Sequence, residues 1–332
     1  MKAGIIGLGH GSRVLIDAFK INGIEVVGIV GSNLSKTKKI CKENNIQKAY
    51  ENWESLVDDK KIKIIAIAVP PQHQIKIFKE CLKNKKIVLC EKPLVTDFKK
   101  INYLPKKINN YFFVDYFFRE HEAFQKFNYL IKKTKFKKEN NINIIFNYQT
   151  YNNKKNITNW KSSSHKGGGI VNLFLSHIVD YLIWFFGKLS KIYCKIKIKN
   201  SNEISLECIF VFKSYMKANI TINLNNPNKM HLIEYKTSNK VILLQNNGKD
   251  LGKKFKIKTK TKYEKVSYIH FKDQTLNFKG DSRILFTAKI IKRIKNNIYN
   301  KPNLKNIKRF YYNEYVLHCA RQSIKKNKEI VL

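Results

Sequence analysis

Two short stretches of this 332-residue chain combine residue types that can do chemistry. Gly7-Leu8-Gly9-His10-Gly11-Ser12 follows a short apolar run near the start, and Cys90-Glu91-Lys92-Pro93 ends a second apolar run, KIVL. Glycines after a strand allow a tight turn and let the backbone approach a phosphate group. A lysine at a strand end offers a cation or a proton to a carbonyl or hydroxyl oxygen. Together the stretches predict a bound dinucleotide beside a lysine, an arrangement for redox chemistry on a small polar substrate.

The glycine turn lies between an expected strand, KAGIIG, and a helix expected over residues 12–22. Gly7 permits the tight turn, and Gly9 permits close approach of a pyrophosphate. The helix N-terminus adds free amides and the positive end of the helix dipole. Ser12 stands where a third glycine is usual, a position that needs only a small residue. We therefore predict cofactor contacts from Gly7, Gly9, His10, Gly11 and Ser12.

The second expected strand, EVVGIVG, leads into Ser32-Asn33, with Lys36 close behind. A carboxylate at this point commonly accepts a hydrogen bond from the ribose of NAD(H). No carboxylate stands here to repel a 2′-phosphate, and lysines are near to receive one. The sequence favours NADP(H) over NAD(H), with contacts from Ser32, Asn33 and Lys36. The alternative is that these lysines only form a solvated helix face.

The pattern of expected elements divides the chain in two. Residues 1–120 alternate strand and helix, which predicts a Rossmann domain with a doubly wound parallel sheet. Residues 121–332 contain strands of period-two alternation, an apolar helix at 171–186 and two late helices. We predict a substrate-binding and oligomerisation domain with an open, mainly antiparallel sheet backed by helices, the last helix packing back toward the N-terminal domain. The free sheet face is expected to form a homodimer or homotetramer, since residues 209–212 are apolar on both phases.

The composition narrows the class of partner. The formal net charge is +41, but the basic residues are nearly all lysine and are spread along the whole chain. A nucleic-acid footprint would concentrate on one face and use arginine, so we expect an anionic small molecule instead. Nucleic-acid binding remains a third hypothesis that rests on charge alone. The sequence predicts neither a metal site nor a membrane partner.

The cysteines and the start of the chain bear on localisation. Six cysteines are scattered without a CxxC pair, as is typical of reduced thiols in a cytoplasm. No apolar run approaches the roughly 18–20 residues that span a bilayer. We interpret the opening MKAGIIGLGHGS as mature structure and not as a signal peptide. These features predict a cytoplasmic protein.

Taken in order, the motifs resemble one family, the Gfo/Idh/MocA oxidoreductases, the group of glucose–fructose oxidoreductase and inositol dehydrogenase. The resemblance covers essentially the whole chain. The features that carry it are the glycine turn, Val69-Pro70-Pro71-Gln72-His73, Glu91-Lys92-Pro93, Arg119, Gly167-Gly168-Gly169, Ser176-His177, Asp180, Trp184 and Gly187. The resemblance implies an NAD(P)-dependent oxidoreductase acting on a sugar, cyclitol or sugar nucleotide.

The resemblance also implies roles for individual residues. Lys92 matches the lysine that contacts substrate near the nicotinamide, and His177 matches a histidine that serves as acid/base or substrate ligand. Pro70, His73 and Glu91 match positions that line the cofactor. Lys92 and His177 are accordingly the predicted catalytic residues, and both are predicted to bind substrate.

Three further substrate contacts are predicted, and one position departs from the family. Arg119 is expected to reach an anionic group, Trp160 lies in a loop before the glycine run, and Asn172 lies on the helix of His177. Many members carry an aspartate four residues before that histidine, where this chain has Leu173. Leucine cannot exchange a proton, so a redox-silent NAD(P)-binding regulator that uses the same cleft is the alternative hypothesis.

Overall fold

The computed structural model describes residues 1–103, 112–134, 136–155, 157, 159–200, 202–248, 250, 252–261, 265–297 and 304–332. These residues form two compact units. The first joins Met1–Phe117 with Lys279–Tyr312, and the second joins Phe118–Phe278 with Asn313–Leu332. The expected boundary after residue 120 lies close to the first break between the units, whereas residues 279–312 group with the N-terminal stretch.

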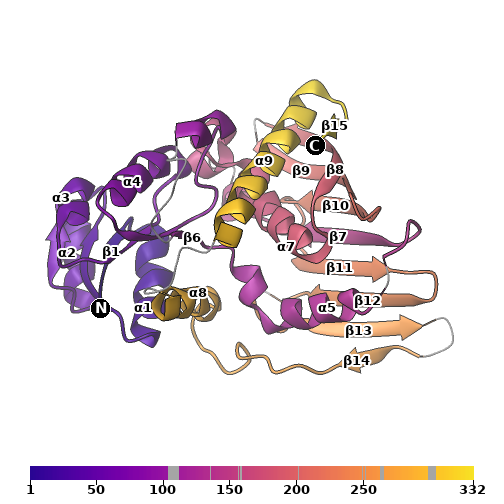
Figure 1. The fold of residues 1–332 in the computed structure, drawn as a ribbon, viewed down its shortest axis with the longest axis horizontal. Helices are drawn as coiled ribbons and strands as arrows, with labels where there is room; N and C mark the ends of the chain where they lie inside the picture. The colour runs from indigo at the N-terminus through magenta and orange to yellow at the C-terminus, as the bar shows by residue number, and fades with distance from the viewer. Residues whose placement is uncertain are drawn as a thin grey trace. The chain divides into compact units, whose positions relative to one another are not determined.

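The first unit contains a six-stranded sheet in the order β3-β2-β1-β4-β5-β6, in which every pair is parallel. This order confirms the predicted doubly wound Rossmann sheet (Figure 1). The three-residue strand β3 escaped the sequence analysis. The strands are β1 (Lys2–Ile6), β2 (Glu25–Val30), β3 (Lys48–Tyr50), β4 (Ile64–Ile67), β5 (Ile87–Cys90) and β6 (Phe112–Val114).

Helices cover both faces of this sheet, which explains why all four residues of β4 are apolar and buried. On one face Phe78 of α4, Phe112 of β6 and Phe310 of α9 belong to one apolar cluster. On the other face α1 packs against α8, and Asn22 Nδ2 donates to Ala288 O at 2.9 Å. The helical elements are η1 (Gly11–Leu15), α1 (Ile16–Ile21), α2 (Leu34–Glu43), α3 (Trp53–Asp58), α4 (Pro71–Lys83), η2 (Phe98–Tyr103), α8 (Arg283–Asn297) and the start of α9 (Leu304–Lys326).

Because the strands are parallel, the loops that follow them emerge at one edge, where open α/β sheets bind their ligands. Backbone hydrogen bonds link these loops to the neighbouring strands. Gly7 N donates to Val30 O, and Glu91 N donates to Ile67 O, both at 2.9 Å. The predicted cofactor residues after β1, β2, β4 and β5 therefore lie along one edge of the first unit.

The second unit contains a nine-stranded sheet in the order β14-β13-β12-β11-β7-β10-β9-β8-β15. Its pairs are antiparallel except for β7 with β10, so the predicted mainly antiparallel sheet is confirmed and is in detail a mixed sheet. The strands are β7 (Asn141–Asn147), β8 (Leu189–Lys199), β9 (Asn202–Phe212), β10 (Lys217–Asn223), β11 (Met230–Lys236), β12 (Lys240–Asn246), β13 (Lys256–Thr261), β14 (Ser267–Ile269) and β15 (Ile330–Val331).

One face of this sheet is covered by helices (Figure 1). Helix α5 contacts β12 and β13, Tyr181 of α7 lies beside His231 of β11, and Ser323 of α9 accepts a hydrogen bond from Cys194 N of β8. Burial alternates along β11, where Ile233 is fully buried and its neighbours are half-exposed. The helical elements are η3 (Phe117–Glu120), α5 (Glu122–Lys132), α6 (Tyr151–Lys155), η4 (Trp160–Ser162), η5 (Ser164–Lys166), η6 (Val171–Leu175), α7 (Ser176–Phe186) and the remainder of α9.

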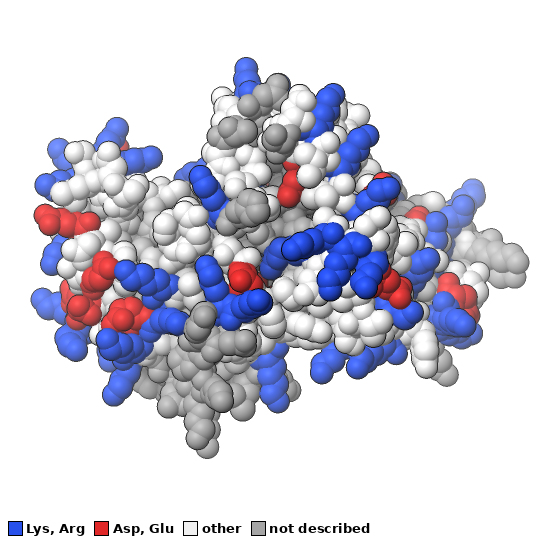
Figure 2. Space-filling view, turned by 90° about the horizontal axis from the view of Figure 1, so that it is seen from above, with Lys and Arg blue, Asp and Glu red and all other residues white. Residues whose placement is uncertain are grey.

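The distribution of charged side chains on the surface and the state of the cysteines agree with what the sequence predicts. On the face shown in Figure 2, lysine and arginine side chains are scattered, and acidic side chains lie among them. The six cysteines are all buried, and none of them forms a disulfide. Within the described residues, no helix combines the length and the apolar character that crossing a membrane requires.

Candidate active site

Each of the three glycines in this turn is explained by a different physical feature. Gly7 has φ +108°, and a Cβ there would lie 2.3 Å from Ala68 O, so only glycine fits. A Cβ at Gly9 would meet no protein atom within 4 Å, so protein packing does not require this glycine. A Cβ at Gly11 would lie 2.8 Å from Ile5 Cγ2, so the close helix–strand contact falls on Gly11. The sequence analysis had assigned the role of the third glycine to Ser12. The Ser12 Oγ instead donates a hydrogen bond to Leu8 O at 2.5 Å.

These features fit a dinucleotide. Gly9 is exposed, and the helix begins directly after it with η1 and α1. A pyrophosphate at this position would meet backbone amides and the positive end of the helix dipole. The glycine turn therefore offers an approach to the backbone that a side chain would obstruct.

The end of β2 lies beside this turn. A Cβ at Gly31 would lie 2.4 Å from Leu8 Cγ, so the two loops pack on each other. Ser32 and Asn33 follow and are exposed, as is Lys36. Asn33 is the N-cap of α2, and its Oδ1 accepts from Lys36 N at 2.8 Å. The cap explains why asparagine suits this position. Ser32, at the end of β2, and Lys36, in the first turn of α2, are exposed.

His10 joins three of these loops. Its Nε2 lies 2.9 Å from Glu91 Oε1 and 3.6 Å from Asp115 Oδ2. Asp115 follows β6, is 3% exposed, and accepts from Thr287 Oγ1 of α8 at 2.8 Å. The sequence analysis missed Asp115. The available signal was one acidic residue inside the aromatic run that ends at Phe118.

The charges in this cluster stabilise one another. Burial alone would lower the pKa of His10, but the attraction of Glu91 and Asp115 raises the pKa to about 10. Burial would raise the pKa of Glu91, but His10, Lys92 and Arg283 hold it below its usual range. The ligand atoms of the three residues lie within 4.8 Å of one another, a spacing that also suits a metal ion. With His10 charged, these contacts form an ion-pair network that joins the glycine turn, the Glu91 turn and the end of β6.

Lys92 lies in a turn that its neighbours constrain. The Lys92–Pro93 peptide bond is cis. Lys92 N donates to Glu91 Oε2 at 3.2 Å, and buried Gln74 donates from Nε2 to Pro93 O at 3.3 Å. Gln74 is a second residue that the sequence analysis missed. Glu91 thus contacts both His10 and the backbone of Lys92, which links the lysine to the glycine turn.

The other predicted cofactor residues of the first unit lie at the start of α4. Pro70 precedes this helix and is half-buried, and its carbonyl accepts from His73 N at 2.9 Å. The His73 ring is exposed, with Nε2 2.8 Å from Gln72 Nε2. Their roles toward the cofactor stay predictions.

In the second unit, the glycine run lets two other groups approach the start of a helix. A Cβ at Gly168 would lie 2.2 Å from the carbonyl oxygen of Trp160. Gly169 has φ +82°, and a Cβ there would lie 2.6 Å from Glu203 Oε2. That oxygen accepts from Ile170 N at 2.5 Å. Burial raises the pKa of Glu203, while the hydrogen bond from Ile170 opposes the rise. The carboxylate fixes the start of η6, which continues into α7.

Asn172 and His177 lie on this continuous helical stretch. Asn172 is 1% exposed, and its Oδ1 accepts from Arg321 Nη1 at 2.6 Å. The half-buried His177 ring meets Phe118 edge-on at 5.4 Å between centroids. Leu173 and Trp160 are half-buried. Asn172 is thus held by Arg321, a residue of the same unit. Its role as a substrate ligand stays a prediction.

Arg119 is held by a carboxylate. Its Nε lies 2.7 Å from Asp180 Oδ2, and its Nη2 lies 3.0 Å from Oδ1. Asn313 Nδ2 also donates to Asp180 at 2.7 Å, and the guanidinium lies over the Trp184 ring. This bidentate pair holds η3 against α7. To bind an anionic substrate group, Arg119 would have to break its pair with Asp180 or contact both groups at once.

Comparison with known families decides where the chain belongs. Residues 1–115 match the oxidoreductase family with an NAD-binding Rossmann fold, and residues 130–229 match the C-terminal alpha/beta domain of the same family. The chain belongs to the Gfo/Idh/MocA family of oxidoreductases. The family resemblance drawn from the motifs is thereby confirmed.

Curated relatives match over part of their length. An uncharacterized oxidoreductase of Synechocystis sp. is 27% identical over 187 residues, which are 55% of this chain and 50% of that protein. The trans-1,2-dihydrobenzene-1,2-diol dehydrogenase of Xenopus tropicalis is 37% identical over 81 residues, 24% of each chain. The aligned stretches therefore span half or less of these relatives.

Solved structures match the whole chain in fold. Levoglucosan dehydrogenase in complex with NADH and L-sorbose has a TM-score of 0.84 at 13% identity, covering 100% of this chain and 98% of that one. An NAD binding oxidoreductase from Klebsiella pneumoniae has a TM-score of 0.83 at 13% identity over the same shares. At these identities the likeness concerns the fold.

Proposed function

We propose that this protein transfers a hydride between the nicotinamide of NAD(P) and a hydroxyl or carbonyl carbon of a sugar, cyclitol or sugar nucleotide. The observation that carries the proposal is the position of Lys92. It follows β5 at the carboxyl edge of a parallel sheet, and its turn is tied to the glycine turn through Glu91 and His10. The solved relatives named for bound L-sorbose and levoglucosan support a sugar as substrate.

The cofactor that we propose is NADP(H) in preference to NAD(H). Ser32, Asn33 and Lys36 are exposed at the end of β2, with no carboxylate among them. A 2′-phosphate would meet the Lys36 ammonium and the amides at the start of α2. The relative with bound NADH has no bearing on this preference at 13% identity.

The two catalytic residues act on the substrate oxygen. The bound nicotinamide supplies or accepts the hydride. The Lys92 ammonium stabilises negative charge on the oxygen, and His177 holds or accepts the proton that the hydroxyl group gives up. Glu91 keeps Lys92 in place through its backbone amide, and Glu203 keeps the His177 helix in place through Ile170.

A redox-silent regulator is the second candidate function. The observation that favours it is Leu173, which stands four residues before His177 where many family members carry an aspartate. Such a protein would bind NAD(P) and a sugar without turnover. In that case Lys92 and His177 would serve as ligands only.

The sheet of the second unit also favours a homo-oligomer, through the face that helices do not cover. Ile209 is 39% exposed there, and Leu232 and Leu243 are half-exposed. Apolar side chains on a sheet face gain free energy when a second copy covers them.

A ligand screen followed by assays for turnover tests the proposal. Thermal shift with NAD(H), NADP(H) and a panel of sugars, cyclitols and sugar nucleotides identifies what binds. A ligand at 100 times its Kd stabilises the fold by about 2.7 kcal/mol. Cofactor-dependent change in absorbance with any stabilising sugar supports the enzyme. Stabilisation by cofactor and sugar without turnover supports the regulator, and absence of any NAD(P) stabilisation contradicts both.

A further inference from the structure

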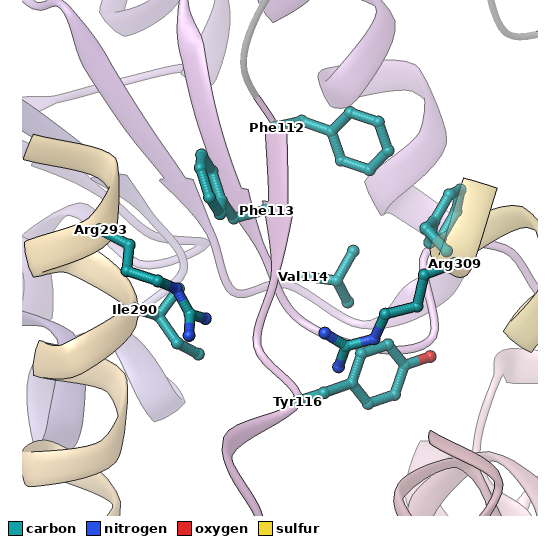
Figure 3. A pocket seen from close by; sticks show the side chains of 8 residues that line it. Phe112, Phe113, Val114, Tyr116, Ile290, Arg293 and Arg309 are labelled. Atoms are coloured by element: carbon teal, nitrogen blue, oxygen red, sulfur yellow. The ribbon is translucent and has the colours of Figure 1, made fainter. Parts of the chain in front are cut away.

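A pocket of the first unit is too small for a sugar or a nucleotide. It lies beside β6, between α8 and α9, and Figure 3 shows Ile290 and Arg309 among the side chains that line it. Its volume of about 30 Å³ leaves room for about two water molecules. The second unit holds a feature with more specific chemistry, a pair of cysteines on neighbouring strands.

Cys194 of β8 and Cys208 of β9 lie directly opposite each other. The two strands are antiparallel neighbours, and their register pairs Cys194 with Cys208 (Figure 1). Both side chains belong to the buried face of the sheet, where they are 0% and 3% exposed. Burial raises the pKa of the Cys208 thiol, and a hydrogen bond with the Cys194 thiol raises it further. Among the strand pairs that the structure describes, no other position brings two cysteines together.

The backbone at Cys194 places this pair in the closer of the two antiparallel geometries. Antiparallel strands alternate between pairs that exchange backbone hydrogen bonds and pairs that do not, and the Cα atoms of the second kind are about 4.5 Å apart. Cys194 N donates to Ser323 Oγ at 2.9 Å, so it is directed away from β9 and the cysteines form a pair of the second kind. Disulfides join residues whose Cα atoms are about 4.4–6.8 Å apart. Two thiols in this register can therefore form a disulfide without a change of strand pairing.

The position of β8 in the sheet gives a small oxidant access to the pair. The sheet order ends β9-β8-β15, and the two-residue strand β15 pairs with β8 at Lys191 and Ile192. Beyond that pairing, the hydrogen bond from Cys194 N to Ser323 of α9 holds the outer side of β8. Segments near the edge of a structure open locally at a lower free energy than its central strands do. Local opening at this edge exposes Cys194 without unfolding of the sheet.

We infer that Cys194 and Cys208 form a reversible disulfide when a peroxide oxidises the protein. One thiolate attacks hydrogen peroxide, which gives a sulfenic acid and one water molecule. The second thiol attacks the sulfur of the sulfenic acid, the S–S bond forms and a second water molecule leaves. The two thiols thereby lose two electrons and two protons, and the peroxide is reduced to water. A dithiol reductant reverses the reaction by thiol–disulfide exchange.

The disulfide fixes β8 on β9 and closes the edge of the sheet against the opening that exposed the thiols. The thiolate is the reacting form of cysteine, so the raised pKa of Cys208 makes the oxidation slow near neutral pH and faster in alkaline buffer. This modification site is independent of the proposed hydride transfer, because neither cysteine is among the predicted cofactor, substrate or catalytic residues.

Mass spectrometry of the wild-type full chain tests the inference without any variant. The folded protein is treated with hydrogen peroxide at about pH 9 and is then denatured in the presence of iodoacetamide. We expect two of the six thiols to escape alkylation and one pair of peptides to be joined through Cys194 and Cys208. Dithiothreitol, added before the alkylation, should restore both thiols. Alkylation of all six thiols, oxidation of either cysteine to a sulfinic acid without joined peptides, or a joined pair that contains another cysteine would overturn the inference.

Amide hydrogen exchange tests whether the disulfide closes the sheet edge. Peroxide should slow the exchange of the β8 amides about tenfold or more in the wild-type protein, and dithiothreitol should restore the faster exchange. Cys208→Ala should show no slowing, whereas the control Cys41→Ala, on α2, should respond as the wild type does. Slowing in Cys208→Ala, or unchanged exchange in wild-type protein that contains the joined peptides, would overturn the closure of the edge by this disulfide.

Discussion

His10 Nε2 lies 2.9 Å from Glu91 Oε1, so the side chain of the glycine turn is paired with the residue that precedes Lys92. Asp115, at 3.6 Å from the same nitrogen, completes the network and ties it to α8 through Thr287. One ion-pair network therefore joins the glycine turn to the Glu91-Lys92-Pro93 turn, and within it Asp115 is buried while His10 and Glu91 are partly exposed. The network reaches the Lys92 turn through Glu91, whose Oε2 accepts a hydrogen bond from Lys92 N.

Replacing His10 should change how stability depends on pH. The folded-state pKa of His10 is raised from 6.5 to about 10, so its stabilisation is complete below about pH 6.5. This stabilisation by His10 decreases as the pH rises above about 6.5, because the unfolded chain then holds fewer protons than the folded protein. It is lost above about pH 10. The slope approaches about 1.4 kcal/mol per pH unit. His10→Gln should remove this slope from urea unfolding measured between pH 7 and 10.

The exposed His73 supplies the control, since His73→Gln changes the same residue type in the same unit. That variant should keep the slope of the wild-type protein. A His10→Gln protein whose unfolding free energy falls with pH as steeply as that of the wild type would contradict the ion-pair network.

Two glycines of one turn should respond in opposite ways to alanine. Gly7→Ala places a Cβ at φ +108° and 2.3 Å from a carbonyl oxygen, and it should destabilise the fold by more than about 2 kcal/mol. Gly9→Ala meets no protein atom and should change stability by less than about 1 kcal/mol. It should nevertheless weaken NADPH binding about tenfold or more, because its methyl group obstructs the pyrophosphate. Unchanged NADPH affinity in Gly9→Ala, measured by calorimetry, would place the cofactor elsewhere.

Local sequence patterns predicted some elements closely. The apolar helix expected at 171–186 is present over the same residues as η6 followed by α7. Amphipathic spacing in α5 and a cap from His121 to Ala123 N are local signals. The parallel sheet was predictable because runs such as β4 are apolar on both faces.

Other features depend on residues far apart in the chain. The grouping of residues 279–312 with the first unit follows from packing of α8 on α1, which no local pattern records. The partners of Arg119 and Asp115 come from distant elements, so sequence reasoning assigned Arg119 to substrate and overlooked Asp115. Glu203 was missed because its role appears only where β9 meets the helix that begins at Ile170.

The proposed preference for NADP(H) should respond to one substitution at the N-cap of α2. Asn33→Asp keeps an oxygen that caps the helix and adds a negative charge near the expected 2′-phosphate. It should weaken NADPH binding about tenfold and leave NADH binding unchanged or stronger. Asn52→Asp makes the same change at the N-cap of α3 and serves as the control. Wild-type protein that binds NADH as tightly as NADPH in calorimetry would refute the preference.

The uncovered sheet face of the second unit should mediate self-association. Light scattering and sedimentation at micromolar concentration are expected to give the mass of a dimer or tetramer. Leu232→Lys and Leu243→Lys each place a charge on a half-exposed apolar position of this face and should shift the mass toward the monomer. Lys217→Glu, at an exposed position of β10, tests whether charge alone is responsible. A wild-type mass of one chain would contradict this proposal.

Lys92 is the residue on which the proposed chemistry depends most, and in this proposal His177 takes part in the proton transfer. With a substrate identified by the ligand screen, Lys92→Ala should lower kcat by about 10²–10⁴ while the Kd for NADPH changes less than threefold. His177→Ala should lower kcat strongly but less completely. Lys99→Ala removes an exposed lysine from the following segment and should be active.

The measurement that decides the account is the steady-state rate of Lys92→Ala compared with that of the wild type and of Lys99→Ala, with NADPH affinity measured on the same samples. The account predicts a variant that binds the cofactor normally and is nearly inactive. A Lys92→Ala protein that binds NADPH and turns over substrate at close to the wild-type rate would contradict it.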